Sequence, residues 1–228
     1  MPYRVGRGTA GVVFHVMNRA VRRLRLFETP NEYQTFLMCL EQGRREYPLK
    51  IYAYCVMPNH FHLVVEPTAD FQLADFMRVT VGMHAKRWHS ARQTVGEGAV
   101  YQGRYRAFPV FADGHFIQVC RYVERNALQA RLVPRAEEWT WSSLNQRCRN
   151  FNVPRLETWP VLPPGNWTDL VNEAQPGDLA RLRKSVRRNL PYGPDGWAER
   201  IAADLKLPFP RWRGRPRKKD VGSVFRNS

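Results

Sequence analysis

The chain has 228 residues, of which 43% are hydrophobic, so it can form one well-packed domain with an appendage or two small domains. Its 36 Lys and Arg residues against 20 Asp and Glu give a net charge of +16. This charge favours a polyanionic partner, most commonly nucleic acid, although a basic membrane-surface or ribosome-associated protein would be similarly charged. No stretch approaches the roughly 18 apolar residues of a membrane span. The four cysteines lack the paired spacing of disulfides or zinc sites, which predicts free thiols in a reducing cytoplasm.

The first elements predicted along the chain are a strand, a helix and a second strand. Residues 11–18 read as the first strand, and residues 49–56, rich in Ile and Tyr, as the second. Between them Thr29 is a suitable N-cap, and Glu32 three residues later completes a capping box. Pro48 ends the helix that begins there.

The third predicted strand carries His60 and His62. A strand alternates its side chains with period two, so both imidazoles leave one face while Phe61, Leu63 and Val65 point to a core on the other. Two neutral imidazoles on a rigid strand supply two-thirds of a first-row metal site. The alternative is a His pair on a solvent-facing strand, so a metal site requires a third ligand from elsewhere.

A third ligand is available on a helix predicted from the N-cap Asp113 to Asn126. Tyr122 and Asn126 are four residues apart, so they lie one above the other on one side of that helix. If this side packs on the histidine strand, Asn126 completes a metal site and Tyr122 points at whatever the metal holds. The alternative for Tyr122 is a half-buried side chain at the edge of the core.

With a further helix at 73–92 and a strand at 105–111, the element order is β-α-β-β-α-β. This order predicts an α+β fold of the ferredoxin-like (split βαβ) type, an antiparallel sheet with helices on one face. That fold also hosts RNA-binding modules and acyl carriers, so it does not decide function. We expect a domain over residues 1–148 and a C-terminal helical and basic appendage over residues 149–228.

The appendage is predicted to hold a connector rich in Pro and Trp, short helices at 178–189 and 195–205, and a basic tail. In the tail, Arg213 and Arg215 belong to an Arg-Gly-Arg-Pro sequence typical of an AT-hook. Such a segment lies extended in a narrow A·T minor groove. A plain polybasic tail is the alternative.

Four motifs follow one another between residues 8 and 145. They are Met57-Pro58-Asn59-His60-Phe61-His62-Leu63-Val64-Val65, Tyr101-Gln102-Gly103-Arg104-Tyr105, Tyr122-Val123-Glu124-Arg125-Asn126 and Trp141-Ser142-Ser143. In this order they resemble the motifs of the REP-associated tyrosine transposases, members of the single-tyrosine HUH transposase superfamily with its IS200-like domain. Ala127 and Arg131 depart from the family, which often has Pro and Gly there; neither position is the nucleophile or a ligand.

The resemblance implies a metal-dependent single-stranded DNA endonuclease and strand transferase that acts on palindromic repeat hairpins. Tyr122 would be the catalytic nucleophile that forms a 5′-phosphotyrosine link, and His60, His62 and Asn126 would hold the metal. This donor set suits Mg²⁺ or Mn²⁺, of which Mn²⁺ tolerates imidazole better. Such a protein is expected in the cytoplasm, on the nucleoid when bound to DNA, as a monomer or a homodimer.

Contacts to single-stranded DNA with a hairpin are predicted from basic, amide and aromatic side chains outside the catalytic set. The candidates are Asn18, Arg19, Lys86, Arg87, Arg104, Tyr105, Arg106, Arg213 and Arg215. Each basic candidate can equally be a solvated surface charge. Tyr105 can stack on an unpaired base or pack in the core.

Two other functions remain open from the sequence. One is a catalytically silent regulator that binds DNA or RNA hairpins on the same fold, although a pure binder would need neither Tyr122 nor the histidines. The other is a small metal hydrolase built on the His-x-His motif, which lacks the nearby Asp and His ligands that dinuclear hydrolases generally need. A covalent protein–DNA product would distinguish the transposase from both.

Overall fold

The computed structural model describes residues 8–150, 152–174 and 179–207. The strands are β1 (Val13–Arg19), β2 (Leu49–Met57), β3 (His60–Pro67) and β4 (Arg106–Val110). The helices are α1 (Pro30–Glu46), α2 (Gln72–Arg92), α3 (Gly114–Glu124), α4 (Asn126–Gln129), α5 (Ser143–Arg149), α6 (Trp167–Asn172), α7 (Leu179–Arg188) and α8 (Asp195–Asp204), with short 3₁₀ turns η1 (Val21–Arg23) and η2 (Ala136–Glu138). The predicted strands and long helices are confirmed, whereas α5 and α6 were not predicted.

The four strands form one antiparallel sheet in the order β2-β3-β1-β4, the order of a ferredoxin-like fold. The predicted fold class is therefore confirmed. Local signals act as expected: the capping box at Thr29 and Glu32 is formed at the start of α1. The tight turn after Met57 places β2 and β3 side by side as a hairpin.

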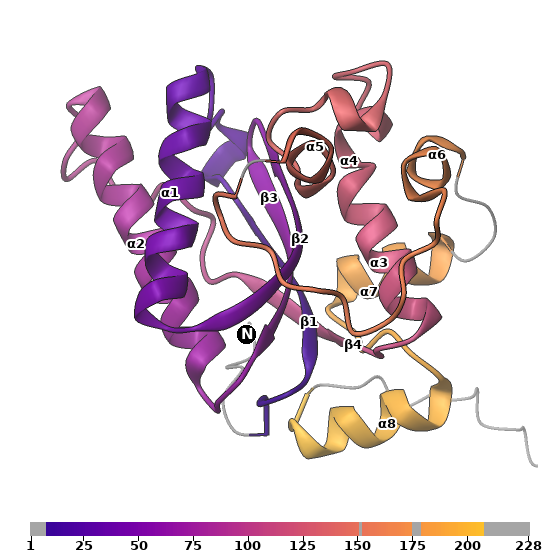
Figure 1. Cartoon of the computed structure of the whole chain (residues 1–228). Coiled ribbons are helices and arrows are strands. Elements are labelled where there is room, and N and C mark those ends of the chain that lie inside the picture. The colour runs from indigo at the N-terminus through magenta and orange to yellow at the C-terminus, as the bar shows by residue number, and fades with distance from the viewer. Residues whose placement is uncertain (1–7, 151, 175–178, 208–228) are drawn as a thin grey trace, which may run out of the picture.

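Helices cover both faces of this sheet, not one. Figure 1 shows α1 and α2 on one side and α3 to α7 on the other. The first face packs Phe61, Leu63 and Val65 against α1 and α2, as predicted from their alternation. The second face also carries apolar side chains, among them Val64 and Phe108, and α3 buries them. The helices are not confined to one face because both faces of the strands are largely apolar.

Segments after α3 pair with both edges of the sheet. Beside β2, Ser142 bridges to Cys55, and Trp141 O accepts a hydrogen bond from Val56 N at 2.9 Å. Beside β4, Tyr192 forms a parallel bridge to Val110. Exposed strand edges are templates for pairing with other chains, so these segments protect the sheet and join the C-terminal part to it.

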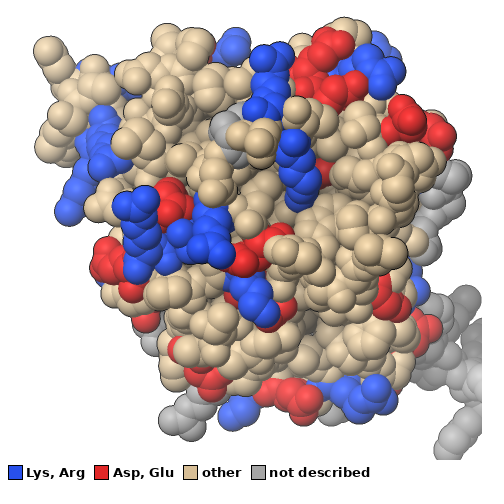
Figure 2. Space-filling model, in the orientation of Figure 1, with Lys and Arg blue, Asp and Glu red and all other residues tan. Residues whose placement is uncertain are grey.

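Acidic and basic side chains are interspersed on the face of the molecule seen in Figure 2. Ion pairs in the described part of the chain include Glu41 with Arg44 and Arg45, and Lys50 with Glu66. None of the helices described is long and apolar enough to cross a bilayer.

Candidate active site

The sheet register gathers the candidate site residues on one face of the three strands β3, β1 and β4. Residues directly opposite each other in antiparallel strands point to the same side. His60 is paired with Arg19, and Met17 is paired with both His62 and Arg106. We call this surface, which α3 covers in part, the histidine face; it consists of His15, Arg19, His60, His62 and Arg106.

Each of the two β3 histidines has one ring nitrogen engaged by a neighbour. Nδ1 of His60 lies 2.7 Å from Oδ1 of Asn59, and since this oxygen only accepts, the proton of His60 is on Nδ1. Nε2 of His60 therefore carries a lone pair. Burial, with a smaller contribution from Arg19, lowers the pKa of His60 to about 4. Burial likewise holds the pKa of His62 well below its usual range, so both imidazoles are neutral at neutral pH.

His15 on β1, which none of the sequence motifs singles out, is the partner of His62. Its Nε2 lies 2.9 Å from Nδ1 of His62, and both rings are buried. Burial, and then Arg106, lower the pKa of His15 to about 3, so the contact joins two neutral rings that share one proton. When that proton is on Nδ1 of His62, Nε2 of His62 is free to bind a metal. Hydrogen bonds of this kind orient metal-binding histidines.

Tyr122, near the end of α3, packs its ring across the histidine pair. The ring centroid lies 5.8 Å from that of His62 and 6.3 Å from that of His15. Burial raises the pKa of the Tyr122 phenol, while Asn126, Arg183 and Arg19 act in the opposite direction. The phenol is therefore protonated at neutral pH in the free protein.

Asn126 begins α4, which only Arg125 separates from the end of α3. Its Nδ2 donates to the backbone oxygen of Tyr122 at 3.2 Å. Asn126 Oδ1 receives no hydrogen bond from the residues that the structure describes. An amide held by its nitrogen and free at its oxygen is suited to coordinate a cation.

Glu124, which follows Tyr122 by two residues, fixes α3 to the segments around it. Its carboxylate is fully buried and accepts hydrogen bonds from Ser143, Arg147 and the indole nitrogen of Trp167, the last at 2.7 Å. Ser143 also accepts from Tyr54 N of β2 at 2.9 Å. The Trp-Ser-Ser motif thus helps to hold the tyrosine helix on the sheet.

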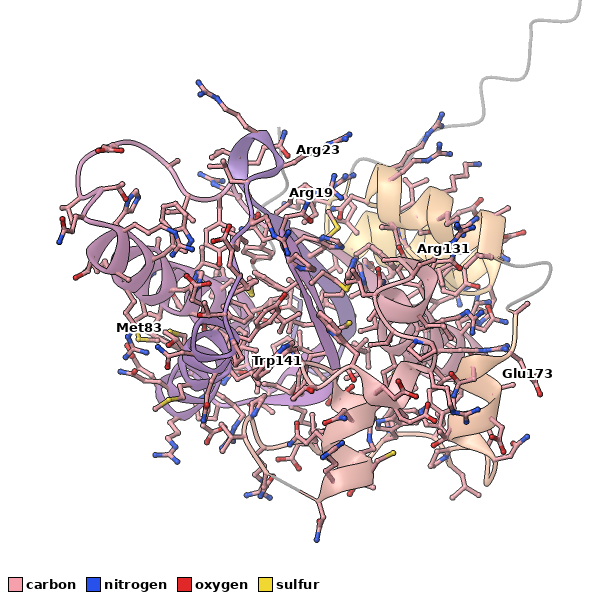
Figure 3. The ribbon with its side chains drawn as sticks, turned by 90° about the horizontal axis from the view of Figure 1, so that it is seen from above. Arg19, Arg23, Met83, Arg131, Trp141 and Glu173 are labelled. Carbon is pink, nitrogen blue, oxygen red and sulfur yellow. The ribbon has the colours of Figure 1, made fainter. Side chains whose placement is uncertain are left out.

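Two of the predicted DNA contacts, Arg19 and Arg106, lie on the histidine face. The Nε atom of Arg19 is buried with no hydrogen-bond partner among the described residues, and its charge acts on Tyr122, His60 and His62. In the view of Figure 3, Arg19 lies between α2, which carries Met83, and the C-terminal helices. A guanidinium in this position can receive an anion beside the histidines.

The other predicted contacts lie elsewhere. Asn18 points to the opposite face of the sheet, where it is buried and donates to Gly103 O at 3.4 Å. Tyr105 is half-buried against the core on that side, and Arg104 is exposed in the loop before β4. Lys86 is exposed on α2, in the layer that covers the far side of the sheet. Arg213 and Arg215 of the tail lie outside the described residues.

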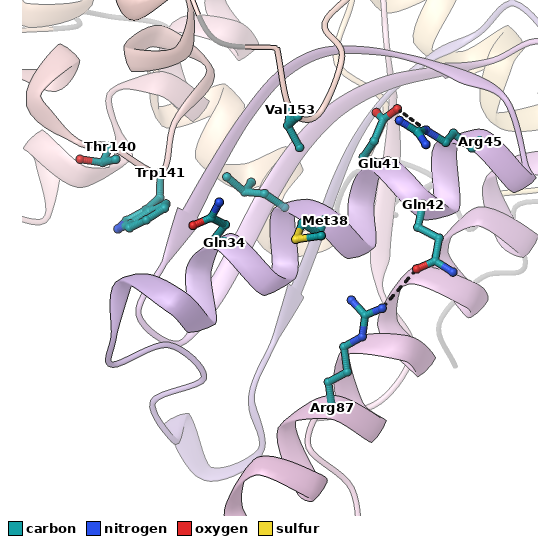
Figure 4. A pocket seen from close by; sticks show the side chains of 10 residues that line it. Gln34, Met38, Glu41, Gln42, Arg45, Arg87, Thr140, Trp141 and Val153 are labelled. Carbon is teal, nitrogen blue, oxygen red and sulfur yellow. Dashed lines mark hydrogen bonds and ion pairs between the residues drawn. The ribbon is translucent and has the colours of Figure 1, made fainter.

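Arg87, also on α2, borders a groove of about 710 Å³ between α1, α2 and the segment after η2. Figure 4 shows Arg87 paired with Gln42 on one side of this groove, Met38 in its middle, and Trp141 beside Gln34 on the other side. This groove is lined by none of the residues of the histidine face. The chemistry of the site therefore does not lie in this cavity but on the sheet face under α3.

A divalent cation at this site would need a mixed set of donors, from the histidine face and from Asn126 of α4. No three His, Cys, Asp or Glu side chains in the described ranges are grouped to hold a metal ion. His60 and His62 each have one ring nitrogen engaged, and Asn126 has a free amide oxygen. A cation held by two nitrogens and one amide oxygen would keep coordination positions open, as a site for a phosphate substrate requires.

Comparisons with known proteins bear on the family and the fold. The family model for IS200-like transposases matches residues 9–126, just over half of the chain and the span from β1 to Asn126. The solved structure of a REP-associated tyrosine transposase bound to a REP hairpin matches with a TM-score of 0.50 and 17% identity, covering 71% of this chain and 93% of that one. A second structure, of a Deinococcus radiodurans R1 protein provisionally assigned as a transposase, covers 52% of this chain and 94% of its own, at 22% identity and a TM-score of 0.39. No curated protein matches the chain.

The fold and the matched segment place the protein in the class of transposases, which in general cleave and rejoin DNA. Within that class the chain belongs to the IS200-like transposase family. The family predicted from the four motifs is confirmed at this level, and the two histidines, Tyr122 and Asn126 all fall inside the matched residues.

Proposed function

We propose that the protein is a metal-dependent single-stranded DNA endonuclease and strand transferase that acts on palindromic repeat hairpins. The observation that carries this proposal is the contact of the Tyr122 ring with His62 and His15 on one face of the sheet, beside Arg19. A hairpin substrate is supported by the family resemblance and by the REP hairpin bound in the matching structure. The REP-associated branch of the family is part of the proposal.

Tyr122 is the nucleophile in this proposal. Its phenolic oxygen attacks the scissile phosphorus, the bond to the 3′ oxygen breaks, and a 5′-phosphotyrosine link forms. The phenol releases one proton to solvent and the departing 3′ oxygen takes one up, so the step is balanced. The phosphodiester energy is kept in the link, so a 3′-hydroxyl can reverse the step without a nucleotide cofactor.

His60, His62 and Asn126 would hold Mg²⁺ or Mn²⁺, which would polarise a non-bridging phosphate oxygen. His15 keeps the proton of His62 on Nδ1 and so positions His62 Nε2 for that role. Arg19 places a positive charge next to Tyr122, where it favours the phenolate and the incoming phosphate. Since burial keeps the phenol protonated, these positive charges are needed for it to react.

The test is an SDS-gel assay with labelled single-stranded repeat hairpins in Mn²⁺, Mg²⁺ or EDTA. We expect a metal-dependent protein–DNA adduct with the parent protein. Tyr122→Phe should abolish the adduct while hairpin binding survives, because the phenyl ring keeps the packing but has no nucleophile. The matched control is Tyr105→Phe, which removes the same atom from a half-buried tyrosine on the other face of the sheet and should leave the adduct intact.

Two results would contradict the assignment. Full adduct yield from Tyr122→Phe would mean that another residue is the nucleophile. Tight hairpin binding with no adduct in any metal would instead favour the catalytically silent binding protein.

A further inference from the structure

The helix α7 belongs to the C-terminal appendage, beyond the residues matched to the family, yet it packs beside the candidate active site. Its Leu182 is buried in the same core as Phe116 and Val119 of α3. At its end, Arg106 on the histidine face donates a hydrogen bond to the backbone oxygen of Arg187. The chain then continues to Tyr192, whose backbone N donates to Pro109 O and whose backbone O accepts from Phe111 N at the β4 edge. These contacts place α7 next to β4 and α3.

Positive charge is concentrated on α7, and most of it is not paired with acidic side chains of the described residues. Five of its ten residues are basic, and all five are exposed: Arg181, Arg183, Lys184, Arg187 and Arg188. Only Arg181 forms an ion pair, with Asp195, within the part of the chain that the structure describes. The unpaired cations cost little in water, but their concentration on one helix suits a polyanion.

Two residues of α7, Arg183 and Arg187, connect the helix to the histidine face. The two are four residues apart and lie on the same side of the helix. The charge of Arg183 acts on the Tyr122 phenol, and the Arg187 backbone contacts Arg106. Lys184 and Arg188 project about 100° further round the helix. They lie toward the side on which Arg181 bonds to Gly193 O and Asp195.

We propose that Arg183 and Arg187 form a binding site for the phosphate backbone of the single-stranded DNA next to the scissile phosphate. The inference rests on the proposed function, since it assumes that the DNA is held at Tyr122. A DNA strand held at Tyr122 must continue beyond the histidine face, and α7 provides cations next to that face. Guanidinium groups bind phosphate oxygens in pairs of charge-assisted hydrogen bonds. The appendage is then part of the substrate site and not only a structural addition.

The experiment measures equilibrium binding by fluorescence anisotropy in the Tyr122→Phe background, so that no strand is cleaved. Two DNAs are compared across a range of salt concentrations: a repeat hairpin alone and the same hairpin with single-stranded extensions on both sides. The test variant is Arg183→Gln with Arg187→Gln. The matched control, Lys184→Gln with Arg188→Gln, removes the same charge at the same spacing from the other side of α7, and both variants retain the basic tail.

We expect the test variant to bind the extended hairpin several-fold more weakly, with a salt slope smaller by about 1.4, because each lost single-strand contact removes about 0.7. Its binding to the bare hairpin, and both affinities of the control variant, should change little. Equal losses in the two variants would overturn the inference, since they would indicate a general effect of charge. An unchanged affinity for the extended hairpin would overturn it as well.

The proposed function fails in a different way. If the parent protein binds neither DNA, the hairpin substrate is wrong, and this inference falls with it. If the parent binds both DNAs equally, the hairpin substrate stands and only the single-strand site on α7 is overturned.

Discussion

At the scale of single residues, the site depends on where each imidazole carries its proton. His60 is oriented by Asn59, and His62 is oriented by His15 on the neighbouring strand. Both contacts occupy Nδ1, so the two Nε2 atoms are the ones left for a cation. Neutral, hydrogen-bonded imidazoles are what metal binding requires, and burial keeps them neutral here.

His15→Phe should weaken Mn²⁺ binding about 10–100-fold, because phenylalanine fills the ring volume but cannot accept the proton of His62. Isothermal titration with Mn²⁺ in the absence of DNA measures this directly. His15→Gln retains an acceptor oxygen and should recover part of the affinity. His84→Phe is the control: this histidine is also buried, but it bonds to Tyr101 on the other side of the sheet. An unchanged Mn²⁺ affinity in His15→Phe would contradict a role in positioning His62.

At the scale of elements, α3 must be held in place for Tyr122 to meet the histidine face. A short helix of 11 residues has little stability alone, so its position comes from tertiary contacts. Its apolar side packs on the sheet, and Glu124 bonds to α5 and to Trp167 at the start of α6. The connector after residue 150 therefore contributes to holding α3 in place.

Trp167→Phe should lower the free energy of unfolding by about 1–3 kcal/mol, because it leaves the fully buried Glu124 with one donor fewer. Denaturant titration followed by circular dichroism measures the change. Trp197→Phe is the matched control, since it removes the same atoms from an indole that packs on Phe111 and donates no hydrogen bond to the described residues. If both variants lost equal stability, the bond to Glu124 would contribute nothing measurable.

At the scale of the whole molecule, helices on both faces bury polar groups as well as apolar ones. His84 on α2 is one of them: burial, with smaller effects from nearby charges, lowers its pKa to about 4. An unfolded histidine has a pKa near 6.5. As the pH falls, the unfolded chain therefore binds this proton near pH 6.5, whereas the folded protein binds it only near pH 4. The stability due to neutral His84 is complete above about pH 6.5 and is lost as pH falls toward 4.

The folded protein should therefore lose stability steadily between about pH 6.5 and about pH 4. His84→Gln should reduce this slope by up to one proton, or about 1.4 kcal/mol per pH unit. The measurement is denaturant unfolding at a series of pH values with EDTA present, so that bound metal does not contribute. The slope, not the absolute stability, is compared, because the variant also loses the bond to Tyr101. Parallel slopes in the two proteins would contradict the prediction.

Local patterns in the sequence determined the elements and much of the candidate site. Alternation put His60 and His62 on one face of β3, and helical spacing put Asn126 next to Tyr122, because both periods depend only on backbone geometry. The tertiary structure alone decided what meets across the fold. Strand register brought His15 to His62, and the packing of α7 brought the charge of Arg183 near Tyr122. His15 alternates with Phe14 and Val16 in the sequence, which places it on a face but does not name its partner. Such contacts join residues far apart in the chain, and their distances follow from how layers pack, which no local period specifies.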